Sequence, residues 1–424
     1  MWTKVTTYFL AIYLQKKQIK IKKKCQGTQN INIIDMIDNL IRKTGLLSFS
    51  TVQKVHWFAN FATLSFFAAY VLQIIALFKA NGDHEKLFEC FSVLSFCGMG
   101  VLKLISLRLN HRHWRYLLTQ ICLLENEQLD NSKTDSEDHF THSINNYTTK
   151  FKGTSTILTR MYSFTAIIFI LSPFVEHFFR KLRGVEPVGY PHILPIWTPL
   201  DSISIFGYTI TVACESLAAM YCVRVHIAFD LTAVGIMIFI CGQFSLLRDC
   251  SARIGGGGNI LKPSKRRDDR AHCRIVQCHR THMLLVNSIG ELDKLLKNIL
   301  GVYFFVATLT LCSVALRINS EEMSVMQLLS LLQYLCATLT QLFLFCRYGD
   351  TVRNESSINM GQGPFAAAYW CLSPRIRREI LIMSAGMMRP RHLRAGPFHS
   401  LDLPSFIQVI RAAYSYYAVL GNKE

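Results

Sequence analysis

Long apolar blocks are the feature that most constrains the fold of this chain. Half of its 424 residues are hydrophobic and only 17% are charged. The apolar residues gather in blocks of about 17–25 residues, the length that an α-helix needs to cross a bilayer. A backbone in lipid must satisfy its own hydrogen bonds, which a helix does. The sequence therefore predicts an all-α membrane protein with seven spanning helices. The predicted spans are Phe58–Phe78, Leu87–Leu107, Ile157–Phe179, Ser202–Cys222, Asn298–Leu316, Val325–Cys346 and Leu403–Leu420.

The basic residues predict the orientation of these helices. Most of the 46 Lys and Arg fall on one side if the N-terminus is intracellular and the C-terminus extracellular, in agreement with the positive-inside rule. An eighth apolar block, Leu231–Leu247, is ambiguous. As a further span it would move the basic cluster from Lys262 to Arg270 outside, so we expect one long helix over Ser202–Leu247. The net charge of +18 then follows from topology, and nucleic acid is not an expected partner.

This topology divides the chain into four segments. They are a cytoplasmic N-terminal segment (1–57), six helices with a long inner extension of the fourth (58–346), a cytoplasmic anchoring segment (347–402), and the last helix with a short outer tail (403–424). Within the first segment, Ile34, Ile37, Leu40 and Ile41 have helical spacing. They predict an amphipathic helix that lies at the inner face of the membrane.

A few ionisable residues fall inside the predicted spans. Lys103 and Arg224 lie toward the inner ends, where a long side chain can extend to water, and we expect both to do so. Glu215 lies deeper. It is either part of a functional site or a hydrogen-bonding group, with Tyr208 or Ser216 as the possible partners.

The last predicted helix carries one polar stripe. At about 100° per residue, the residues that share this sector are Ser405, Gln408, Arg411, Ser415 and Asn422. Because charge facing lipid is costly, the stripe must face either water or other protein. The pattern alone leaves both interpretations open.

The stretch from residue 364 to residue 420 resembles the C-terminal signature of insect odorant receptors. The matching features, in order, are Ala368-Tyr369-Trp370, Arg375 to Arg378, Arg389-Pro390, Ala395-Gly396, Phe398, Leu401, Ser405-Phe406 and Ala413 to Tyr417. This resemblance implies a tetrameric, ligand-gated, non-selective cation channel in the plasma membrane of olfactory sensory neurons. It also implies that an odour-tuning subunit such as this one assembles with a shared co-receptor subunit as a hetero-tetramer.

In that family the last helix of each subunit lines the pore. The implied pore-lining residues here are Ser405, Gln408, Arg411, Ser415, Val419 and Asn422. Val419 is the one bulky apolar residue near the outer end of the stripe, and a ring of such residues can stop ions by dewetting. In the alternative orientation Val419 packs against a neighbouring span, and Leu420 or Tyr416 faces the axis.

The resemblance also implies a binding site for small volatile apolar molecules in the outer half of the bundle. The residues at matching depth are Phe88, Phe91, Phe169, Pro173, Phe174, Tyr208, Val212 and Tyr334. Aromatic side chains supply a large apolar contact area, but each of these residues can equally be part of the packed core.

Other classes of protein fit less well. A gustatory receptor has the same architecture but a different C-terminal ending. A G-protein-coupled receptor needs an extracellular N-terminus, and its Asp-Arg-Tyr and Asn-Pro-x-x-Tyr elements are missing from this sequence. No catalytic constellation is present, and two Cys and two His in residues 272–282 fit no common zinc spacing. We therefore expect no enzyme activity, metal or cofactor, and membrane lipid as the surroundings.

Overall fold

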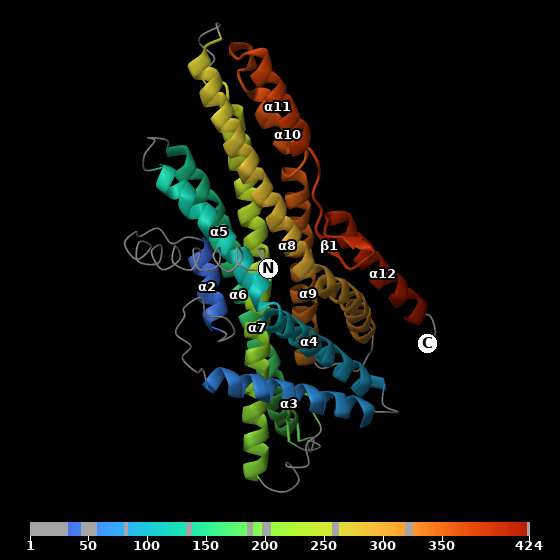
Figure 1. Ribbon diagram of the computed structural model, residues 1–424. Coiled ribbons are helices and arrows are strands. Elements are labelled where there is room, and N and C mark those ends of the chain that lie inside the picture. Colours follow the sequence, from blue (N-terminus) through green and yellow to red (C-terminus); the bar gives the residue numbers. More distant parts are fainter. Residues whose placement is uncertain are drawn as a thin grey trace, which may run out of the picture.

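The computed structural model describes residues 33–43, 57–79, 84–132, 138–184, 190–196, 205–256, 263–318 and 325–421, which are almost entirely helical (Figure 1). The helices are α2 (Ile33–Lys43), α3 (Trp57–Lys79), α4 (His84–Leu109), α5 (His111–Ser132), α6 (Asp138–Leu182), α7 (Ile205–Ala252), α8 (Lys265–Ile318), α9 (Val325–Glu355), α10 (Ile358–Ala366), α11 (Pro374–Met387) and α12 (Leu403–Gly421). A 3₁₀ turn (Tyr369–Cys371) lies between α10 and α11, and strands β1 (Arg394–Ala395) and β2 (His399–Ser400) form a short antiparallel hairpin.

Six of these helices, α3, α4, α6, α7, α8 and α9, are long and apolar enough to cross a membrane. They contain five of the first six predicted spans, and α7 contains the fourth from Ile205 onward, since residues 202–204 lie outside the described residues. The seventh predicted span coincides with α12, whose 19 residues have the required length. This helix is not among the six because Gln408, Arg411 and its other polar residues lower its mean hydropathy.

Helix α7 runs through the middle of the molecule (Figure 1). Its 48 residues continue without a break through both apolar blocks, so the prediction of one long helix is confirmed. Every residue from Leu231 to Ile240 is buried. Gly235 and Gly242 allow other helices to pack closely on α7. A Cβ added to Gly242, for example, would lie 2.5 Å from Cδ1 of Tyr147.

The amphipathic helix predicted near the N-terminus is present as α2, but its apolar face contacts protein. Ile33, Ile37 and Ile41 are buried, and Cδ1 of Ile37 would lie 2.9 Å from a Cβ at Gly235 of α7. The apolar face therefore packs on protein instead of lipid, while the location of α2 at the inner face of the membrane stays a prediction. Amphipathic spacing indicates an apolar partner without distinguishing lipid from a neighbouring helix.

The segment that leads into α12 is fixed to α8. The guanidinium of Arg394 donates to Oδ2 of Asp293 at 2.6 Å, and its backbone N–H donates to Oδ1 at 2.8 Å. Gly396, at φ 72°, lies very close to Gly301 of α8. A Cβ added to Gly301 would lie 2.6 Å from Cα of Gly396. A side chain at either glycine would separate the hairpin from α8.

The start of α12 is fixed by a capping residue. Oδ1 of Asp402 accepts the backbone N–H of Ser405 at 3.0 Å, and Oδ2 lies 3.5 Å from the Arg353 guanidinium of α9. Burial alone would raise the pKa of the Asp402 carboxyl, but hydrogen bonds from Ser405 and from the Ser400 hydroxyl, with the nearby Arg353 cation, hold it below its usual range. The helix therefore leaves α8 and α9 in a defined direction.

Glu125 of α5 is a buried carboxyl in the larger hydrophobic core. Its Oε1 accepts the Tyr147 hydroxyl at 2.8 Å, whereas its Oε2 has no hydrogen-bond partner among the described residues. Burial raises the pKa of this carboxyl from 4.5 to about 7, and the negative charge of Asp35 on α2 adds to the increase.

The raised pKa predicts how Glu125→Gln changes stability with pH. A group whose pKa is higher in the folded state binds more protons there, so wild-type stability falls between about pH 4.5 and 7. The uncharged variant avoids this loss. As the pH is raised from about 4.5 to 7, its stability relative to wild type should rise by up to about 3 kcal/mol, and above pH 7 the difference should level off. Thermal unfolding of the purified protein at pH 5, 6, 7 and 8 measures this difference. A difference that does not change with pH would contradict the prediction.

Candidate functional site

A cavity of about 580 Å³ lies between α3, α4, α6, α7, α8 and α9, next to residues 190–196. Its size is in the range of small-molecule sites. Apolar side chains dominate the wall; among them are Val93, Phe96, Phe169, Pro173, Ile193, Leu194, Ile196 and Leu331.

The structure separates the residues predicted for ligand binding into three groups. Phe169, Pro173 and Tyr334 line the cavity. Phe91, Phe174, Tyr208 and Val212 do not; Phe174 and Val212 pack instead against the smaller hydrophobic core beside it. The side chain of Phe88 lies outside the described residues.

A carboxylate of α7 holds one wall of the cavity in place. Oε2 of Glu215 accepts the backbone N–H groups of Ile193 at 2.8 Å and Leu194 at 3.4 Å, and Oε1 lies 3.0 Å from Nδ1 of His192. Residues 192–196 all line the cavity. The Tyr208 hydroxyl donates to the Pro191 carbonyl at 2.8 Å.

This geometry answers the question that the sequence left open for Glu215. The carboxylate is 1% exposed and binds a loop, whereas Ser216 donates to the Val212 carbonyl of its own helix. A buried charge is stable when several donors satisfy it. Glu215 therefore positions part of the cavity wall.

Replacing Glu215 by Gln should loosen this wall. One carbonyl oxygen would replace two charged acceptors, and hydrogen bonds to charged groups contribute about 1.5–3 kcal/mol. We expect the amides of Ile193 and Leu194 to exchange with deuterium roughly ten times faster or more, as measured by mass spectrometry. Ser216→Ala is the matched control, because among the described residues the Ser216 hydroxyl bonds only to the Val212 carbonyl of α7. Equal exchange in wild type and Glu215→Gln would exclude this role.

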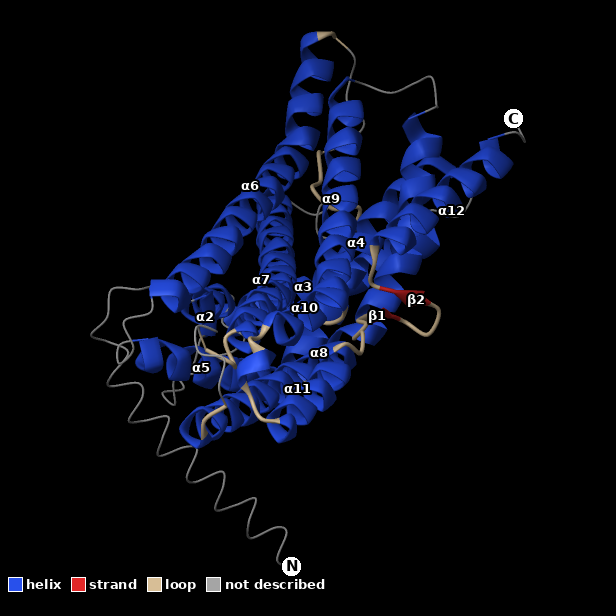
Figure 2. Cartoon of the chain, turned by 90° about the horizontal axis from the view of Figure 1, so that it is seen from above, coloured by secondary structure: helices blue, strands red, loops and turns tan. Residues whose placement is uncertain are grey.

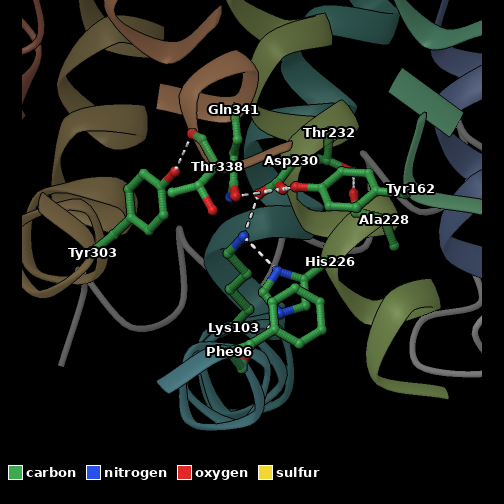
Figure 3. Close-up of polar contacts among 10 residues, drawn as sticks. All are labelled: Phe96, Lys103, Tyr162, His226, Ala228, Asp230, Thr232, Tyr303, Thr338 and Gln341. Atoms are coloured by element: carbon green, nitrogen blue, oxygen red, sulfur yellow. Dashed lines mark hydrogen bonds and ion pairs between the residues drawn. The ribbon is translucent and has the colours of Figure 1, made fainter. Parts of the chain in front are cut away.

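Polar side chains of α4, α6, α7 and α9 form a buried cluster (Figure 3). Nζ of Lys103 on α4 lies 2.6 Å from Oδ1 of Asp230 on α7 and 3.0 Å from Nδ1 of His226. The Tyr162 hydroxyl donates to Oδ2 of Asp230 at 2.6 Å, and Nε2 of Gln341 donates to the same oxygen at 3.0 Å. Tyr162 also lines the cavity, so the cluster and the cavity share a residue.

The expectation that Lys103 extends to water was wrong. Its side chain is 0% exposed, and its ammonium lies 5.6 Å from the ring centre of Phe229 and 5.8 Å from that of Tyr303. An ion pair with Asp230 makes burial of the charge possible. Both residues were visible in the sequence as charges within apolar blocks, but nothing there showed that α4 and α7 are neighbours at this depth.

Helix α12 lies at the edge of the molecule in both views (Figure 1 and Figure 2) and packs on α8 and α9. Of the residues predicted to line the pore, Gln408, Arg411, Ser415 and Val419 are exposed. Ser405 is only 4% exposed and faces the protein, and Asn422 lies outside the described residues. The exposed stripe thus runs from Gln408 to Val419.

Comparison with known proteins supports one family. Residues 83–414 match the family model described as 7tm Odorant receptor. Odorant receptor 13a of Drosophila melanogaster is 25% identical over 343 residues, 76% of this chain and 78% of that protein. Odorant receptor 22c of the same species is 26% identical over 266 residues, 60% of this chain and 63% of that protein.

A solved structure has the same fold. The olfactory receptor OR5 from Machilis hrabei, determined in complex with eugenol, superposes with a TM-score of 0.70 at 15% identity, covering 92% of this chain and 98% of that one. Because the matching family model spans well over half of the chain, the protein belongs to the seven-transmembrane odorant receptor family of insects.

Proposed function

We propose that this protein is the odour-tuning subunit of a ligand-gated, non-selective cation channel. The observation that carries the proposal is the cavity of about 580 Å³, walled mainly by apolar side chains, in a chain of the odorant receptor family. A volatile apolar molecule is stabilised when its surface leaves water for such a cavity, and it gains contact there with aromatic side chains. The related OR5 was solved with one small aromatic molecule, eugenol.

The same proposal assigns the pore to α12. Its exposed stripe carries Gln408, Arg411 and Ser415, and these side chains need water or another subunit beside them. In a tetramer with the co-receptor, four such stripes would surround a shared axis, with Val419 forming a constriction. The position of α12 at the edge of the molecule supports this arrangement.

The function is tested by recording from cells that express the chain with the co-receptor, without it, or with the co-receptor alone. We expect odour-evoked cation currents whose odour preference depends on this chain. Currents that are the same whether or not this chain is present would exclude a tuning role.

The proposed orientation places the N-terminus in the cytoplasm and the C-terminus outside. An epitope tag before Met1 should bind antibody only after permeabilisation, and a tag after Glu424 should bind antibody on intact cells. The reverse labelling pattern would contradict the orientation, and with it the assignment of the cavity to the outer half.

A further inference from the structure

One wall of the cavity is polar where α6 and α9 meet; Glu176, which is also in this wall, accepts hydrogen bonds from Arg180 and Gln327. Thr165 and Ser172 of α6 and Ser330 and Gln333 of α9 all line the cavity. Thr165 and Ser172 are seven residues apart and therefore lie on the same face of α6. The two helices are joined here by a hydrogen bond from Nε2 of Gln333 to Oγ1 of Thr165, at 3.1 Å.

This bond fixes the Gln333 amide and leaves part of it unused. The Thr165 hydroxyl donates its own proton to the Met161 carbonyl at 2.9 Å, so Thr165 can only accept from Gln333. A Gln amide has two N–H donors and a carbonyl acceptor. In the described part of the chain, no further hydrogen bond is seen for the second N–H or for Oε1 of Gln333. Both groups are available at the cavity wall.

The same wall contains an additional acceptor. Pro173 lies inside α6 and has no N–H, so the carbonyl of Phe169 four residues earlier lacks its helical hydrogen bond. Phe169 and Pro173 both line the cavity. The wall thus offers the Gln333 N–H as a donor together with acceptors at Gln333 and Phe169, and the Ser172 hydroxyl lies in the same wall.

A hydroxyl group matches this combination, because it accepts one hydrogen bond and donates another. A hydrocarbon would cover the Gln333 amide without satisfying it, and an ether would satisfy the donor only; a buried polar group without a partner is costly. We propose that Gln333 is a specificity-determining residue that makes the cavity selective for apolar molecules carrying one hydroxyl group, alcohols and phenols. This inference rests on the proposed function and narrows its ligand class.

The test compares matched ligands on cells that express the chain with the co-receptor. The probes are linear alcohols of six to ten carbons and 4-alkylphenols, each paired with its methyl ether. We expect the wild type to respond to the hydroxyl compounds at roughly 3–10-fold lower concentration than to the ethers, the range expected of a neutral hydrogen bond. Gln333→Met, similar in length and without polar hydrogens, should reduce this difference, because the ethers lose only the bond from the Gln333 N–H whereas the hydroxyl compounds also lose the Gln333 carbonyl acceptor.

Two further variants make the result specific. Thr165→Val, which removes the acceptor that orients the amide, should reduce the preference partly. Thr351→Val is the matched control on the same helix; the Thr351 hydroxyl donates to the Arg347 carbonyl at 2.8 Å and Thr351 does not line the cavity, so the preference should be unchanged. Surface labelling confirms that each variant is expressed, and Gln333→Leu replaces Gln333→Met if the latter is not.

The outcomes separate the two proposals. If Gln333→Met shifts alcohols and ethers equally, or if the wild type prefers ethers, the role of Gln333 is wrong while the receptor function stands. If the surface-expressed wild type responds to none of these probes but responds to other odorants, the ligand class is wrong. If no odorant evokes a current that depends on this chain, both proposals fall.

Discussion

Replacing Lys103 by Met is expected to destabilise the protein by about 3–5 kcal/mol, the usual effect of removing one member of a buried ion pair. Asp230 would keep its hydrogen bonds from Tyr162 and Gln341 but lose the ammonium at 2.6 Å. Asp230→Asn should have a similar effect, because it leaves the Lys103 ammonium beside His226 without a carboxylate. The measurements are the thermal midpoint of the purified protein and the amount that reaches the cell surface.

The double variant Lys103→Met with Asp230→Asn provides the control. It removes both charges, while Asn keeps an oxygen for the Tyr162 hydroxyl, so its loss should be smaller than the sum of the two single losses. Simple additivity would show that the two residues are not energetically coupled. Arg224→Met, which removes an exposed cation from α7, should change stability little.

Replacing Val419 by Ser should open the channel in the absence of odour. Val419 is 61% exposed in the isolated subunit, and the proposed position at the pore requires such exposure. A narrow apolar ring excludes water, whereas a ring with added hydroxyl groups stays wet and conducts ions. We expect a several-fold increase in background current in cells that express the variant with the co-receptor, measured by whole-cell recording.

Val409→Ser is the internal control for this prediction. Val409 is on the same helix but 4% exposed, so the substitution should reduce expression without causing a leak. A silent Val419→Ser channel together with a leaking Leu420→Ser channel would mean that α12 has the other rotation about its axis, and the stripe assignment would fail.

Hydropathy predicted the positions of the spanning helices well. Helix α9 begins at Val325 and α12 at Leu403, both as predicted, because transfer from water to lipid depends on composition over about 20 residues. The pattern also predicted α7 as a single helix. It could not reveal the hairpin that docks on α8, since that contact depends on the close approach of Gly301 and Gly396.

The candidate site was only partly predictable, because depth in the membrane does not fix the rotation of a helix. Phe169 and Pro173 line the cavity, but Phe174, one residue further, points about 100° away and packs in the core. Ser405 shares the polar sector of α12 and is nevertheless buried. Gln333 was visible as a polar residue in an apolar block, and only its pairing with Thr165 shows its orientation.

The ion pair has a consequence for how the protein is made. Lys103 precedes Asp230 by 127 residues, and at about 5–20 residues per second the ribosome needs roughly 6–25 s to make the intervening chain. During that interval α4 has a lysine without its carboxylate, at a cost of up to about 2.5–3.5 kcal/mol, the value for a lysine at the centre of an inserting helix. The remaining apolar residues of α4 must offset this cost until α7 emerges. A chain truncated before residue 230 would therefore keep an unneutralised lysine within the bilayer, a mark by which incomplete receptors differ from finished ones.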